Sequence, residues 1–261
     1  MNSSYYDTRC GNEDVEEAGG ESILGFSELT ENKMLWRMLV AELIGTLLLV
    51  FIGCGSILTL NGGDINYVQI GLTFGLTIAT IVQTICHISG GHLNPAVTLS
   101  FFVTGEVKLI KAILYILVQC IGAVCGAAIL RAITPADKLG NLGITNINPS
   151  LDPMQGFIVE AILTFLLLIV IHGVCDTRRK DVKGSAPLAI GVAIVACHLA
   201  GIQYTGSSLN PARSFGPAVI MNLWANHWIY WAGPIVGAVV AALIYKYIFK
   251  YRKGESDSYD F

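Results

Sequence analysis

Long apolar runs separated by short polar segments dominate the sequence. A helix that crosses a bilayer needs about 20 predominantly apolar residues. Six runs approach or exceed that length, at about 36–60, 68–87, 109–133, 155–175, 187–203 and 228–249. The pattern therefore predicts an all-α membrane protein with six transmembrane helices.

Two shorter apolar segments do not fit this series. They lie near 94–103 and 210–220, and each directly follows a glycine-containing polar stretch. About ten residues of helix are too few to cross a hydrocarbon core of ~30 Å. Irregular backbone at membrane depth is tolerated only where protein or a water-filled cavity surrounds it. We therefore expect two re-entrant half-helices beside a cavity.

The composition supports a membrane protein and argues against other classes. Of 261 residues, 53% are hydrophobic and only 13% are charged, against roughly 25% charged residues in a soluble domain. A net charge of −3 gives no basic surface for nucleic acid. The histidines and seven cysteines show no metal-ligand spacing. No nucleophile–base pair or phosphate loop is present, so we expect neither an enzyme nor a cofactor, and neither a metal site nor a nucleic-acid partner.

The charges at the two ends of the chain predict its orientation. Residues 1–34 read as a flexible acidic tail and residues 251–261 as a second tail, on either side of a channel domain at 35–250. Lysine and arginine concentrate in the loop 176–186 and after the last apolar run. Basic residues accumulate on the cytoplasmic side of membrane proteins. Both termini are therefore expected in the cytoplasm.

An internal repeat divides the channel domain into halves at about 35–133 and 154–250. Positions 116 residues apart carry the same residues: Asn94-Pro95-Ala96 and Asn210-Pro211-Ala212, Gly90 and Gly206, Leu93 and Leu209. Each half holds three spans and one half-helix. Because three is odd, the second half enters the membrane from the opposite side, which defines an inverted repeat. The two half-helices should then meet near the midplane.

The repeated tripeptide has a chemistry of its own. Asparagine is a preferred helix N-cap and proline a preferred first helical residue. The side-chain oxygen of each asparagine is expected to accept from the helix backbone, which leaves its NH₂ group to donate into a lumen. Two such helix starts place two donors and two positive dipole ends together. This constriction would accept the oxygen of a neutral molecule and repel cations.

The segments HISGGHLNPAVT (87–98) and GSSLNPARS (206–214) resemble the two signatures of the major intrinsic protein, or aquaporin, family. The resemblance covers about residues 35–250 and is closest to the water-selective aquaporins of animals. It implies a right-handed bundle of six helices plus two half-helices with a pore in each protomer. It also implies a homotetramer in a lipid bilayer, with the plasma membrane as the expected location.

The resemblance also assigns roles to individual residues. A selectivity filter falls on Phe74, His198, Ser207 and Arg213. Backbone carbonyls that line the pore are expected at Gly90, Gly91, His92, Gly206, Ser207 and Ser208. Glu42 and Glu160 match the buried glutamates of the family, and we interpret them as buttresses that accept hydrogen bonds from the re-entrant loops.

Water is the expected permeant. Glycerol-conducting relatives carry a small residue where this chain has His198, and an aspartate where it has Ser214. Three alternatives stay open: a channel that also passes glycerol or urea, a non-conducting junctional member of the same fold, and an ion-coupled transporter. Two Gly-xxx-Gly patterns, at 122–126 and 233–237, predict close helix packing within the protomer.

Overall fold

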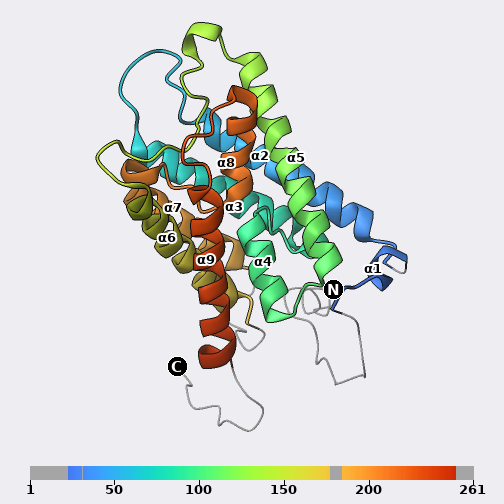
Figure 1. Ribbon diagram of the computed structural model, residues 1–261. Helices are drawn as coiled ribbons and strands as arrows, with labels where there is room; N and C mark the ends of the chain where they lie inside the picture. The colour runs from blue at the N-terminus through green and yellow to red at the C-terminus, as the bar shows by residue number, and fades with distance from the viewer. Residues whose placement is uncertain (1–22, 31, 177–183, 251–261) are drawn as a thin grey trace.

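The computed structural model describes residues 23–30, 32–176 and 184–250. Within them all regular structure is helical (Figure 1). The six long helices are α2 (Leu35–Gly55), α3 (Tyr67–Ser89), α5 (Leu109–Ile133), α6 (Pro153–Val174), α7 (Ala186–Thr205) and α9 (Ile229–Ile244), which a π-helical turn at Tyr245–Phe249 extends. All six are long and apolar enough to cross a membrane. The predicted set of six spans is confirmed.

The remaining helices are short. They are α1 (Ser27–Thr30), α4 (Pro95–Thr104), α8 (Pro211–Met221) and a 3₁₀ turn at Ala136–Lys138. The helices α4 and α8 are the two predicted half-helices, and they enter the bundle from opposite ends (Figure 1). The fold class is therefore confirmed.

The first span is shorter than its apolar run. The run was expected to continue to residue 60, but α2 ends at Gly55. Gly53 and Gly55 lie in the last turn of α2, and the Ser56 hydroxyl donates to the Gly53 carbonyl oxygen at 2.7 Å. This side-chain bond competes with continued helix. Ile57, Leu58 and Leu60 therefore belong to the connection between α2 and α3 and not to the span.

Glycines set the closest helix contacts. A Cβ at Gly122 or Gly126 of α5 would collide with backbone carbonyls of α2, and one at Gly237 of α9 with a carbonyl of α6. The pairs α2–α5 and α6–α9 pack along their length, so the prediction of packing within the protomer is confirmed. Gly75 of α3 and Gly191 of α7 face each other in the same way. These two are equivalent positions of the repeat, so the axis that relates the halves passes between them.

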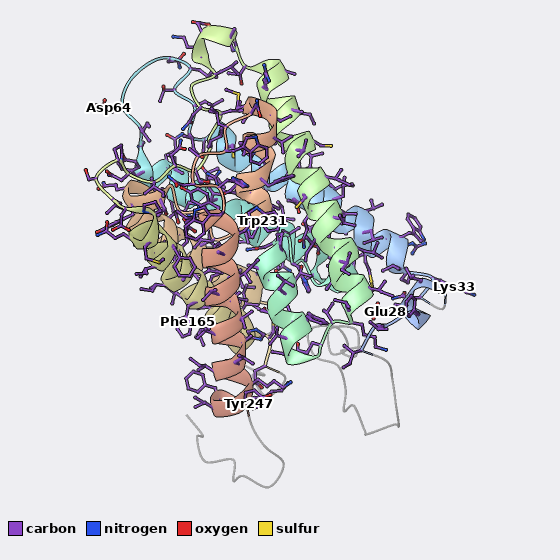
Figure 2. All side chains as sticks on the ribbon, in the orientation of Figure 1. Glu28, Lys33, Asp64, Phe165, Trp231 and Tyr247 are labelled. Carbon is purple, nitrogen blue, oxygen red and sulfur yellow. The ribbon has the colours of Figure 1, made fainter. Side chains whose placement is uncertain are left out.

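Both described ends of the chain lie at the end of the bundle where α4 finishes. Lys246 donates to the Thr104 carbonyl at 2.9 Å, and the Leu109 amide donates to the Ile23 carbonyl at 3.1 Å. Figure 2 places Glu28, Lys33 and Tyr247 toward this end and Asp64 toward the other. Most of the two predicted tails, and Arg178–Lys183 of the basic loop, lie outside the described residues.

Candidate functional site

The two predicted asparagines meet at the N-termini of the half-helices. Asn94 Oδ1 accepts from the Ala96 amide at 2.8 Å, and Asn210 Oδ1 accepts from the Ala212 amide at 3.0 Å. The amide groups then cross over between the halves. Asn94 Nδ2 donates to the Leu209 carbonyl and Asn210 Nδ2 to the Leu93 carbonyl, both at 2.8 Å. One hydrogen of each NH₂ group is thus used to tie the halves together, and one remains.

The loops that lead into the asparagines have matching backbones. Gly90 and Gly206 end α3 and α7 in the left-handed region, at φ 91° and 81°. Leu93 and Leu209, directly before the asparagines, also have positive φ, at 55° and 58°. Such values are uncommon for a residue with a branched side chain. Their recurrence at equivalent positions shows that both loops are held in one shape by their surroundings.

Glu42 and Glu160 supply that support. The carboxylate of Glu160 accepts from the Thr205 hydroxyl at 2.6 Å and from the Ser208 and Leu209 amides at 2.9 Å. Glu42 accepts in the same way from its own half; its loop donors are the Ser89 hydroxyl and the His92 and Leu93 amides, and Gln119 Nε2 of α5 donates to it as well. Both glutamates are fully buried. Each uses both oxygens to satisfy loop N–H groups that the irregular backbone leaves without helical partners.

Three of the four predicted filter residues form one cluster. The rings of Phe74 and His198 stack at a centroid distance of 4.5 Å. The Arg213 guanidinium carbon lies 4.8 Å from the centre of the Phe74 ring. All three side chains are only 2% exposed. The fourth, Ser207, is fully buried beside α7, and its hydroxyl donates to the Cys197 carbonyl at 3.2 Å.

Hydrogen bonds orient the two polar side chains of this cluster. His198 Nδ1 lies 3.0 Å from the Ile194 carbonyl oxygen. A carbonyl only accepts, so Nδ1 carries the proton and Nε2 of the neutral ring is an acceptor. Arg213 donates to the Gly143 carbonyl at 2.6 Å. His198 Nε2 and Arg213 Nε are buried without a partner, so the cluster has both an acceptor and a donor to offer.

The connection between α5 and α6 contributes residues that the sequence reading missed. Leu142, Ile144 and Thr145 are buried in it, and the Thr145 and Ser214 hydroxyl oxygens lie 2.7 Å apart. Nothing in the local pattern of this segment marks it as part of the site, because Gly143 acts through its backbone carbonyl. The sequence offered one signal for this segment, namely that it lies outside the six predicted spans.

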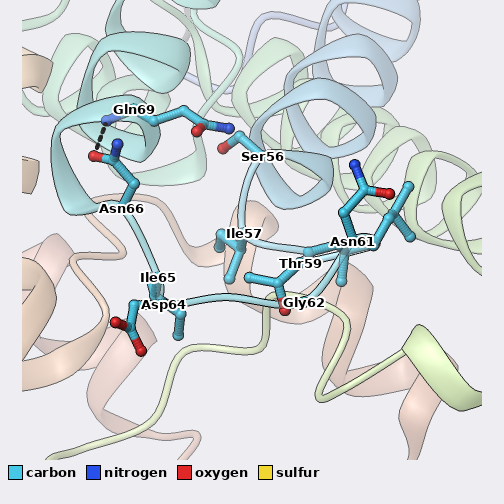
Figure 3. Close-up of a pocket in the computed structure, with 11 residues that line it drawn as sticks. Ser56, Ile57, Thr59, Asn61, Gly62, Asp64, Ile65, Asn66 and Gln69 are labelled. Atoms are coloured by element: carbon cyan, nitrogen blue, oxygen red, sulfur yellow. Dashed lines mark hydrogen bonds between the residues drawn. The ribbon is translucent and has the colours of Figure 1, made fainter.

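A surface cavity lies apart from this cluster. It occupies about 210 Å³ within the α2–α3 connection, where Ser56, Asn61, Asp64 and Gln69 are among the lining residues (Figure 3). No filter residue and neither tripeptide lines it. Among the described residues, no group of three or more histidines, cysteines or carboxylates is placed to hold a metal ion. This cavity is therefore separate from the candidate site, which comprises the paired asparagines and the cluster of Phe74, His198 and Arg213.

Six membrane-crossing helices, two half-helices that meet end to end and a polar cluster beside them define a membrane channel with an inverted repeat. The family model described as major intrinsic protein matches residues 28–245. The chain belongs to the major intrinsic protein family, and the resemblance found in the sequence is confirmed. Members of this family are channels, not enzymes.

Characterised relatives narrow the class further. The chain is 46% identical to aquaporin-4 of Mus musculus over 245 residues, which cover 92% of this chain and 75% of that protein. It is 48% identical to aquaporin-4 of Homo sapiens over 218 residues, 82% of this chain and 68% of that protein. It is 45% identical to the lens fiber major intrinsic protein of Lithobates pipiens over 82% of this chain and 81% of that protein. The chain is a multi-pass membrane protein of the water-selective aquaporin type.

A solved structure confirms the architecture alone. The aquaglyceroporin from Plasmodium falciparum superposes with a TM-score of 0.72 over 82% of this chain and 97% of that one. Its sequence identity is 23%, so it carries no argument about the permeant.

Proposed function

We propose that the chain passes water in single file down osmotic gradients, through a filter formed by Phe74, His198, Ser207 and Arg213. The observation that carries the proposal is the packing of the filter, with His198 stacked 4.5 Å from Phe74 and Arg213 4.8 Å from the same ring. The constriction is narrow because three large side chains share it. Water can replace its lost hydrogen bonds there with His198 Nε2 and the Arg213 guanidinium.

Proton exclusion follows from the asparagine pair. Each of Asn94 and Asn210 keeps one N–H that is not used in the crossed bonds. A water molecule that accepts from both must point its own hydrogens away along the pore in opposite directions. Such a molecule cannot relay a proton. The positive ends of α4 and α8 meet at the same place and repel H₃O⁺ and other cations.

The remaining path is assigned to backbone carbonyls. Gly90, Gly91 and His92 in one loop, and Gly206, Ser207 and Ser208 in the other, lie between a long helix and a half-helix, where the carbonyls are not committed to a regular helix. We assign them as acceptors along one wall of the pore. Sparse acceptors hold water weakly, which favours rapid passage.

The alternatives fit the site less well. A glycerol path needs room for a carbon edge, but His198 occupies that position and Ser214 is fully buried and bonded to Thr145 and Ser208. A non-conducting junctional member would not need an intact filter with unpartnered polar groups. An ion-coupled transporter would need charges free to bind ions, whereas both buried glutamates are committed to loop amides.

The functional unit is proposed to be a homotetramer in the plasma membrane, with both termini in the cytoplasm and residues 35–250 as the channel domain. Apolar side chains spaced four residues apart along α2 are exposed in the protomer: Trp36, Val40, Ile44, Leu48 and Ile52. Such a stripe must be covered by lipid or by another protomer. The family resemblance favours a second copy of the chain for part of it.

Stopped-flow light scattering of proteoliposomes tests the filter. We expect rapid osmotic shrinkage for the wild type and no swelling on an isotonic glycerol gradient. His198→Ala should raise glycerol permeability about tenfold or more, since a misfit of one methylene in a selective pocket already changes discrimination by roughly 10–200-fold and the imidazole is larger than that. Arg213→Ala should also admit glycerol.

Val97→Ala is the matched control, because Val97 holds the position equivalent to Arg213 in the other half and is also buried. It should leave glycerol exclusion intact. The proposal would be refuted if the wild type gave no osmotic response. It would also be refuted if the wild type passed glycerol as fast as His198→Ala and Arg213→Ala do.

A further inference from the structure

The last turn of α2 touches two walls of the proposed filter through adjacent residues. Gly53 faces the ring of Phe74 so closely that a Cβ there would lie 2.6 Å from the Phe74 Cζ. Phe74 therefore occupies its place only because residue 53 has no side chain. Neither Gly53 nor Cys54 contributes a polar side chain to the cluster itself.

Cys54 reaches the other wall through the α5–α6 connection. Its side chain is fully buried, and its Sγ lies 3.9 Å from the Gly143 carbonyl oxygen. The same oxygen accepts from the Arg213 guanidinium at 2.6 Å. Gly143 has φ 73°, and a Cβ on it would lie 2.8 Å from Cys54 Cβ and 3.1 Å from Cys54 Sγ. The loop thus rests directly on Cys54.

We propose that Gly53 and Cys54 are positioning residues that set the width of the filter: Gly53 seats Phe74, and Cys54 seats the Gly143 carbonyl that holds Arg213. The inference rests on the filter assignment made above. One rigid helical turn fixes both the aromatic wall, Phe74, and the cationic wall, Arg213. The separation of the two walls therefore does not depend on the α5–α6 connection alone. Neither residue contacts the permeant.

The two contacts predict opposite effects when a methyl group is added. In Gly53→Ala the new methyl pushes the Phe74 ring away from α2, toward His198 and Arg213. Water permeability per channel should fall several-fold while glycerol stays excluded. In Gly143→Ala the loop must move off Cys54 and its carbonyl leaves Arg213. Glycerol permeability should then rise by about tenfold, the lower end of what one methylene does in a selective pocket.

The chain offers a matched control for each change. Gly55 lies in the same turn as Gly53, and a Cβ there would meet only Leu130 at 3.5 Å, an ordinary contact. Gly140 lies in the same connection as Gly143, also has positive φ at 52°, and has open space around its Cβ position. Gly55→Ala and Gly140→Ala should therefore keep the wild-type ratio of water to glycerol permeability.

The experiment measures water and glycerol permeability per folded channel in proteoliposomes, with a rescue. Cys54→Gly removes the Cβ and Sγ that crowd a Cβ at residue 143 and leaves only the Cys54 Cα, at 3.1 Å, so adding it to Gly143→Ala should restore a measurable part of the glycerol exclusion. Where Gly143→Ala gives no folded protein, Cys54→Ala is the alternative variant. It removes the thiol beside the Gly143 carbonyl and keeps a residue that favours helix. Its glycerol permeability should rise by less than the tenfold expected for Gly143→Ala.

The inference is overturned if Gly53→Ala and Gly143→Ala keep the wild-type ratio of water to glycerol permeability, or if their control variants change that ratio equally. It is also overturned if adding Cys54→Gly to Gly143→Ala restores no glycerol exclusion, or if Cys54→Ala leaves the ratio unaltered. Arg213→Ala separates this from failure of the filter assignment. If Arg213→Ala admits glycerol and Gly143→Ala does not, only the positioning role fails. If Arg213→Ala also excludes glycerol, the filter assignment fails first.

Discussion

At the scale of single residues, Glu160 shows how an acidic side chain inside a span stabilises irregular backbone. Its carboxylate accepts three hydrogen bonds from the second re-entrant loop. Glu160→Ala leaves those three donors buried without an acceptor. Because each buried unsatisfied group costs about 1–3 kcal/mol, we expect a clear loss of folded yield and of melting temperature in detergent, with little change in selectivity of the protein that does fold.

Glu106→Ala provides the comparison for that experiment. Glu106 lies outside the spans, is exposed, and is 3.9 Å from Lys250. Surface ion pairs of this kind are worth about 0–1 kcal/mol, so its removal should leave yield and melting temperature unchanged. Normal yield of Glu160→Ala with altered selectivity would mean that the carboxylate acts on the permeant and not on the loop.

Ser207 and Cys197 lead to a second prediction, about mercurial reagents. The Cys197 side chain is 1% exposed and its thiol lies 3.4 Å from the Leu163 carbonyl, against α6. Ser207 is one of the four proposed filter residues. The wild type should therefore keep its water permeability in low concentrations of HgCl₂, while Ser207→Cys places a thiol in the constriction and should be blocked.

Osmotic shrinkage with and without the reagent checks this, and a reductant should reverse the block. Ser207→Ala should remain insensitive. Block of the wild type that disappears in Cys197→Ser would show that the Cys197 thiol is reachable from the pore and would contradict the prediction.

The residue types in the sequence predicted part of the candidate site but not all of it. Asn94 and Asn210 precede short apolar segments, and Glu42 and Glu160 are acidic residues inside apolar spans, so a re-entrant structure supported by buried carboxylates was predictable. The crossing of the asparagine amides to carbonyls of the opposite half was not, because it depends on how the loops meet. Gly143 was missed for the same reason, since a backbone carbonyl leaves no trace in residue type.

At the scale of elements, small residues decide which helices touch. Gly237 of α9 packs against the Ala161 backbone of α6, where a Cβ would collide. Gly237→Ala should force the two helices apart, and overpacking of this kind typically costs about 1–3 kcal/mol. We expect a lower melting temperature in detergent and a smaller folded fraction.

Gly173→Ala is the matched control in α6. A Cβ at Gly173 would meet only Tyr245 at 3.8 Å, an ordinary contact, and alanine favours helix by roughly 1 kcal/mol over glycine. Its melting temperature should stay the same or rise. Equal loss of stability in both variants would indicate that glycine is needed for backbone reasons and not for close packing.

Element boundaries were the least predictable feature. From apolar content alone, the first span was expected to continue to residue 60, because Ile57, Leu58 and Leu60 are as apolar as the helix before them. The end at Gly55 depends on the Ser56 hydroxyl and on the two glycines of the last turn. In contrast, α3 and α7 run to Ser89 and Thr205, where the hydroxyls bond to the buried glutamates. The repeat places both ends at equivalent positions.

At the scale of the whole molecule, the inverted repeat requires an even number of spans and puts both ends of the chain on one side. Contacts of α4 with the C-terminal turn and of α5 with residues 23–24 agree with this. The basic residues near that end favour the cytoplasm.

An epitope added to either terminus should therefore bind antibody only after cells are permeabilised. The same epitope inserted at Gly62, where a Cβ would meet open space in the α2–α3 connection, should bind on intact cells. Permeability of the tagged proteins to water confirms that each is folded. Termini that bind antibody on intact cells would reverse the assigned orientation, and one terminus on each side would contradict the repeat itself, because three plus three spans cannot separate the ends.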